Sequence, residues 1–116
     1  MSARPTDLLC AMLVGLPAAL APAAILAETV TVNQKDRRFE IQHVEIVAGD
    51  IVSFTNDDRF LHQIYANSPR FSFDSAEQFP GEVVDVRFPR EGAFEVRCGI
   101  HPKMLLKVEV SPAPEE

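Results

Sequence analysis

Cysteine is scarce in this sequence, which has only Cys10 and Cys98 among its 116 residues. A small exported domain held together by several disulfides is therefore excluded. Cys10 lies in a leader that we predict is removed, which leaves Cys98 as a single thiol. An unpaired cysteine is a liability in an oxidising compartment unless it is buried, reactive or bound to a metal.

Positive charge is also scarce, since 11 Lys and Arg residues stand against 17 Asp and Glu, a formal charge of -6. A nucleic-acid partner is excluded, because it would require a basic face. The charge favours a soluble protein whose partner carries a complementary basic patch. Helical periodicity, internal repeats and low-complexity segments are absent as well. No cluster of acid, base and nucleophile is visible, so we do not expect an enzyme. We also expect a monomer.

One long apolar run is present, from residue 8 to residue 27, without a single charged side chain. Roughly 20 apolar residues could cross a bilayer as a retained anchor. Pro17, Pro22, the high alanine content and the small residues at the end of the run favour a cleaved secretory signal peptide instead. We predict a signal peptide over 1–27 that directs the protein to the periplasm, and one domain over 28–116 with no membrane attachment after cleavage.

Beyond the leader, short segments alternate between apolar and polar residues, as half-buried strands do. Within the second segment the alternation slips near His43, which predicts a bulge and a surface histidine, with Phe39 and Ile41 pointing inward. Turn residues separate the segments, and the count predicts an all-β, Greek-key β-sandwich of about seven to eight strands. The predicted strands cover residues 28–33, 39–47, 51–56, 63–66, 83–88, 93–98 and 105–110.

A group of sulfur and nitrogen donors lies near the C-terminus, where Cys98, His101 and Met104 are three residues apart. Soft sulfur with imidazole suits copper, and two histidines with a cysteine and a weak axial methionine form an electron-transfer site. A second histidine must come from elsewhere. His62 is the candidate, because it follows a polar loop at the start of a strand, and loops at the end of a sandwich carry sites on a rigid scaffold.

The motif from Cys98 to Met104, C-G-I-H-P-K-M, is similar to the short ligand loop of amicyanin. With the segment A-G-D-I-V-S-F-T-N, it resembles the type 1 blue copper proteins of the plastocyanin and azurin family, the cupredoxins, and also small cupredoxin-like proteins often labelled methylamine utilisation proteins. The resemblance implies a cupredoxin-like β-sandwich and one type 1 copper ion. It implies His62, Cys98 and His101 as equatorial ligands and Met104 as the axial one.

The chain departs from the family after the first histidine ligand. Many members have there an asparagine that donates a hydrogen bond to the thiolate, whereas this chain has Gln63. In the family the C-terminal histidine is the redox-active edge and lies within an apolar patch. The residues that could form this patch here are Phe60, Leu61, Ile100, Pro102 and Leu105.

Three functions remain open at this level. The first is a periplasmic electron carrier that docks briefly to a redox protein such as a c-type cytochrome or a dehydrogenase. The second is a copper-handling protein for tolerance or delivery, which the lack of Met-rich or His-rich tracts disfavours. The third is a metal-free sandwich that acts as a binding module, in which Cys98 would react freely with thiol reagents.

Overall fold

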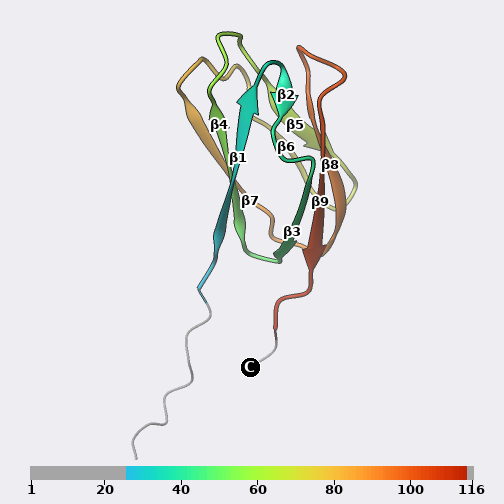
Figure 1. Ribbon diagram of the computed structural model, residues 1–116. Coiled ribbons are helices and arrows are strands. Elements are labelled where there is room, and N and C mark those ends of the chain that lie inside the picture. Colours follow the sequence, from blue (N-terminus) through green and yellow to red (C-terminus); the bar gives the residue numbers. More distant parts are fainter. Residues whose placement is uncertain (1–25, 115–116) are drawn as a thin grey trace, which may run out of the picture.

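The computed structural model describes residues 26–114, which form nine strands and no helix (Figure 1). No helix in this part of the chain could therefore span a membrane. All but the last two residues of the predicted signal peptide, residues 1–27, lie outside the described residues, so the leader stays a prediction. The strands are β1 (Thr29–Lys35), β2 (Arg38–Phe39), β3 (His43–Val47), β4 (Ile51–Asn56), β5 (Ile64–Asn67), β6 (Ser72–Asp74), β7 (Val83–Arg87), β8 (Gly92–Cys98) and β9 (Leu105–Ser111).

The strands pack as two mixed sheets, which confirms the predicted all-β sandwich. One sheet has the order β2-β1-β4-β7, and the other has the order β3-β9-β8-β5-β6. The pairs β1 with β4 and β3 with β9 are parallel, and the other pairs are antiparallel. Two parallel strands cannot be joined by a tight hairpin turn, so the chain crosses to the other sheet between them. Loops that are far apart in the sequence therefore meet at each end of the sandwich.

The core lies between the two sheets and is built by the alternation seen in the sequence. Alternate residues of β8 and β9 point inward, because successive side chains of a strand face opposite sides. Phe54 and Phe88 are fully buried at its centre. Burial of such a side chain contributes about 1.5–3 kcal/mol.

The second predicted strand, residues 39–47, is in fact divided between the two sheets. Phe39 ends β2 in the first sheet, and His43 begins β3 in the second. Ile41 lies in the crossing and is 42% exposed, so its predicted inward position is wrong, whereas Phe39 is buried. The slip in alternation near His43 marks this change of sheet, and His43 is exposed as predicted.

Nine strands form instead of seven or eight because two short ones carry no periodic signal. β2 and β6 have two and three residues. Each exists only by pairing with a neighbour, β2 with β1 and β6 with β5. A strand of this length shows too few residues for an alternation to be recognised.

Four connections lie at one end of the sandwich, which is the top of Figure 1 and is called the upper end below. They are the β1–β2 turn, the loop that follows β4, the connection between β6 and β7, and the loop between β8 and β9. Asp36 and Arg37 form the two-residue turn with φ of 54° and 59°. Positive φ at both positions is what a type I′ hairpin turn requires. The predicted metal ligands lie in these loops or beside them.

Candidate metal centre

Cys98 is the last residue of β8 and points into the upper end of the sandwich. It follows Phe94 and Val96 in the inward phase of the strand, and its side chain is 1% exposed. β8 pairs here with β5, with Ile64 opposite Cys98. The sulfur is thus held by the sheet and shielded from water.

His101 lies three residues further on, in the turn that leads to β9. The backbone N–H of Met104 donates to the His101 carbonyl at 3.0 Å and closes this turn. The turn places His101 Nδ1 3.8 Å from Cys98 Sγ. Met104 is 3% exposed, so its thioether is buried in the same loop, and its role as an axial ligand stays a prediction.

His62 reaches the sulfur from the other side, in the segment between β4 and β5. It forms two backbone hydrogen bonds with Gln78, and its ring is fully buried. His62 Nδ1 lies 3.6 Å from Cys98 Sγ. The donor atoms of His62, Cys98 and His101 all lie within 4.8 Å of one another. The structure therefore brings together three residues that the sequence separates by up to 39 positions.

Asp58 orients the His62 ring and was missed by the sequence analysis. His62 Nε2 lies 3.1 Å from Asp58 Oδ2, which also accepts the Arg37 backbone N–H at 2.7 Å. Burial raises the pKa of Asp58, but the hydrogen bonds from Arg37 and His62 hold it below its usual value. A charged carboxylate favours a proton on Nε2, so Nδ1 is the nitrogen that faces the sulfur and is left to bind a metal. A carboxylate four residues before a candidate histidine was the signal available.

The sulfur is in an environment that favours the thiolate. Burial would raise the pKa of the Cys98 thiol, but hydrogen bonds from His62 and from three backbone N–H groups outweigh it and lower the pKa to about 6. Burial would lower the pKa of His62, whereas Cys98 and Asp58 raise it more. Metals bind the thiolate, so little free energy is lost in removing its proton at neutral pH.

Gln63, which follows His62, donates a hydrogen bond to the sulfur through its backbone. Its backbone N–H donates to Cys98 Sγ at 3.4 Å. Its side chain instead donates to both carboxylate oxygens of Asp74 at 3.0 Å and packs over Gly99. A Cβ at position 99 would lie 2.5 Å from Gln63 Oε1, so a larger residue there requires the Gln63 side chain to shift.

A buried network of amides supports the His62 segment from below. Gln78 Oε1 accepts from Gln34 at 2.8 Å, and Asn56 Nδ2 donates to the carbonyls of Phe60 and Gln78 at 3.0 and 3.1 Å. All three amide residues are at most 3% exposed. Such a network holds the loop in one conformation, since breaking it leaves polar groups buried without partners. Nothing in their sequence spacing indicated that they meet.

The three donors are spaced as a bound ion requires. Bonds of about 2.0–2.1 Å to nitrogen and about 2.3 Å to sulfur, joined at an angle between tetrahedral and trigonal, separate the two atoms by about 3.6–3.8 Å. The two Nδ1 to Sγ distances are 3.6 and 3.8 Å. A thiolate with two imidazoles and a nearby thioether is the donor set of blue copper sites. The residues present therefore fit a copper ion.

A second group of possible donors lies on the outer face of the five-stranded sheet, the same sheet that carries Cys98 at the end of β8. His43 and Glu45 on β3 and Glu109 on β9 also have donor atoms within 4.8 Å of one another, and all three are exposed. His43 Nε2 is already 2.6 Å from Glu109 Oε2. The group contains no sulfur, and its histidine is engaged with a carboxylate.

No protein-family model matches this sequence, and no curated protein matches it either. Solved structures do match, and the fold they define is that of the cupredoxins. This confirms the fold that the sequence resemblance implied.

The matching structures include amicyanins and a purple cupredoxin. Amicyanin from Paracoccus versutus (Thiobacillus versutus) is 22% identical, with a TM-score of 0.67 over 75% of this chain and 85% of that chain. A reduced mutant of amicyanin is 19% identical, with a TM-score of 0.67 over 72% and 82%. The purple cupredoxin from Nitrosopumilus maritimus is 23% identical, with a TM-score of 0.63 over 71% and 99%.

Proposed function

We propose that this protein is a periplasmic blue copper protein that carries single electrons between redox partners and is not an enzyme. The observation that carries the proposal is the approach of both imidazole Nδ1 atoms to one buried sulfur, at 3.6 and 3.8 Å. Copper, when bound, supplies a one-electron couple between Cu(II) and Cu(I). The proposed equatorial ligands are His62, Cys98 and His101, and the proposed axial ligand is Met104.

The protein's own residues keep this site rigid and dry. Cys98 and His62 are held by sheet pairing and by Asp58, and both are at most 1% exposed. The hydrogen bond between the His62 ring and the Asp58 carboxylate fixes the orientation of the ring. A donor set that changes little between oxidation states keeps the reorganisation small, which favours rapid electron transfer over substrate chemistry. Four protein ligands also leave no open position for a substrate.

The electron would leave through His101, because this ligand is the one near the surface. His101 is partly exposed, whereas His62 is fully buried. The Phe60 ring meets the His101 ring edge-on, with centroids 6.0 Å apart, and Ile100 beside it is 43% exposed. A small apolar surface around His101 suits a brief encounter with a c-type cytochrome or a dehydrogenase.

The test is a visible absorption and electron paramagnetic resonance measurement on the purified protein after one equivalent of Cu(II) is added. We expect an intense thiolate-to-copper absorption band, and its loss on reduction with recovery on oxidation. Binding of Cu(II) without an intense band would contradict a thiolate ligand. A blue protein that gives up its copper rapidly to a chelator and exchanges no electrons with cytochrome c would instead indicate copper handling.

A further inference from the structure

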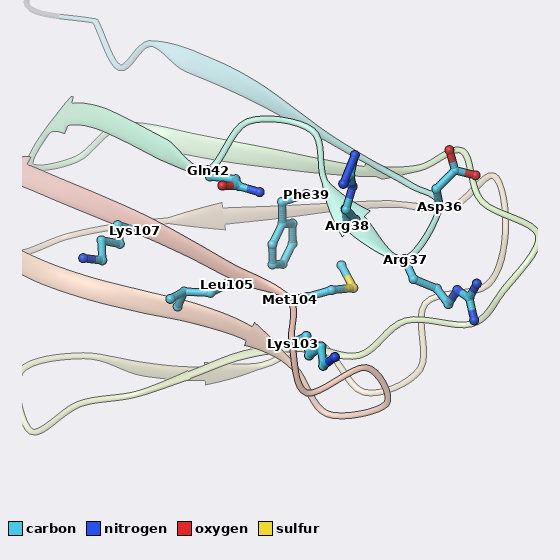
Figure 2. A pocket seen from close by; sticks show the side chains of 9 residues that line it. All are labelled: Asp36, Arg37, Arg38, Phe39, Gln42, Lys103, Met104, Leu105 and Lys107. Carbon is cyan, nitrogen blue, oxygen red and sulfur yellow. The ribbon is translucent and has the colours of Figure 1, made fainter.

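A groove opens beside the proposed copper site, between β2 and the segment that joins β8 to β9. Its volume is about 640 Å³ (Figure 2). Arg37 and Arg38 line it from the β1–β2 hairpin, and Lys103 and Lys107 line it from the other side. Asp36 is the one acidic residue among those that line it. The groove is therefore basic in a chain whose formal charge is -6.

The floor of the groove is apolar and belongs partly to the proposed site. Phe39 and Met104 lie next to each other in its middle, with Arg38 on one side and Lys103 on the other (Figure 2). Phe39 is 2% exposed and Met104 is 3% exposed. A ligand in the groove would thus contact the outer side of the residue proposed as the axial ligand.

The basic side chains of the groove form no close ion pair among the described residues, although Glu95 is opposite Lys107 in the pairing of β8 with β9. Among residues 26–114, no carboxylate lies within ion-pair distance of Arg37, Arg38, Lys103 or Lys107. The Arg37 guanidinium lies 5.0 Å from the centre of the Phe60 ring. Phe60 also contacts the partly exposed His101, so the Arg37 end of the groove lies near this proposed ligand. Unpaired charge of one sign in a hollow attracts a partner of the opposite sign.

We propose that this groove docks an acidic segment of the redox partner, an inference that rests on the proposed function for the existence of such a partner. Cations on both sides of an apolar floor match an acidic segment that carries an apolar side chain between acidic ones. Acidic side chains would meet the Arg and Lys residues, while an apolar side chain would lie on Phe39 and Met104. The net charge of -6 would by itself favour a basic partner. The groove is basic, so the segment that docks in it is expected to be acidic even though the chain as a whole is negative.

The segment would also change the copper potential. Negative charge placed beside Met104 stabilises the more positive oxidation state, Cu(II), and so lowers the reduction potential. Docking would therefore favour the oxidised carrier, and release of the electron at the docked partner would become easier.

The probe for this proposal is a fluorescein-labelled peptide in which glutamate and leucine alternate, followed by fluorescence anisotropy with and without copper. We expect binding that weakens as ionic strength rises from low salt to about 0.15 M. Arg38→Glu and Lys103→Glu should each weaken it by about fivefold, since each replaces an attraction by a repulsion. The matched control is Arg90→Glu, which makes the same charge change at the opposite end of the sandwich and should alter binding by less than about twofold.

Three results would overturn the proposal. Equal weakening by Arg90→Glu would show an effect of net charge only. Equal binding of a peptide with serine in place of leucine would remove the role of the floor. Inorganic phosphate or phosphatidylglycerol vesicles that bind through Arg38 and Lys103 as tightly as the peptide would identify a different occupant. Retained folding of each variant is checked by thermal unfolding.

The peptide measurement separates the two proposals. If the peptide binds the copper-free protein but added Cu(II) gives no intense band, the groove binds acidic segments, but the proposed electron carrier fails and the segment is not that of a redox partner. If the band forms and the peptide does not bind, the groove proposal fails alone. A potential that falls when the peptide is added to the copper protein would support both.

Discussion

Two groups of side chains among residues 26–114 each bring three donors within 4.8 Å of one another, but they differ in burial and in donor chemistry. The group of His62, Cys98 and His101 lies at the upper end of the sandwich and includes two buried residues. The group of His43, Glu45 and Glu109 lies on the outer face of the five-stranded sheet and is exposed throughout. Proximity alone therefore does not distinguish a metal centre from a surface ion pair.

The two groups differ in donor chemistry and in support. The upper group has a thiolate and a histidine held by Asp58, whereas His43 is bonded to Glu109 at 2.6 Å with both side chains about half exposed. Water and salt screen exposed charges, and such pairs contribute about 0–1 kcal/mol. A site for a soft metal needs soft donors kept dry and oriented, which only the upper group supplies.

The largest expected effect follows from removal of the sulfur. Cys98→Ser should abolish the intense visible band, because an alcohol cannot supply the thiolate-to-copper charge transfer. Absorption spectra of both proteins with one equivalent of Cu(II) measure this, with thermal unfolding of the metal-free forms as the folding control. An unchanged spectrum would show that Cys98 is not a copper ligand, and the difference in donor chemistry between the two groups would then have no consequence for copper binding.

The next effect concerns the support of His62. Asp58→Asn keeps the shape but removes the charge that orients the ring, so copper affinity should fall about 10–100-fold. Competition with a chelator of known affinity measures the change. Asp57→Asn is the matched control. It removes the same charge one residue away, but Asp57 is exposed, whereas Asp58 is the carboxylate that contacts His62. Equal losses in both variants would mean that the carboxylate acts only through overall charge.

A smaller effect is expected where the ligand loop is packed. Gly99→Ala would place a Cβ 2.5 Å from Gln63 Oε1, so the loop or Gln63 must move. The clashing atom is the end of a side chain that can move, so we expect a cost of about 1 kcal/mol in the free energy of unfolding, the lower end of the range for overpacking. Urea denaturation measures it, and adding Gln63→Ala should recover part of the loss because the clash is gone. Independent, additive losses in the double mutant would argue against this contact.

The smallest effect is expected at the exposed group. His43→Gln should change the free energy of unfolding by less than about 0.5 kcal/mol and leave one copper per protein, since a surface pair contributes little. Denaturation curves and metal analysis after removal of loosely bound copper provide the two readouts. A protein that binds two equivalents of copper, and loses one of them with His43→Gln, would break the contrast between the groups.

Much of the fold and of the site could be predicted because it depends on patterns within short segments of the sequence. Alternation identified the long strands, and the spacing of Cys98, His101 and Met104 identified the donors of one loop. His62 was found because the donor set required a second nitrogen. Asp58, by contrast, has the composition of any loop carboxylate, and its role exists only because the chain folds back to place it 3.1 Å from the ring.

By itself, the sequence determined the class of fold and which residue types can hold a metal, because strand periodicity and donor chemistry are local properties. The tertiary structure alone decided the change of sheet after Phe39, the amide network below His62, and the basic groove between β2 and β9. Each depends on pairing between segments distant along the chain, such as β1 with β4 and β3 with β9, and no local pattern records which segments will be neighbours.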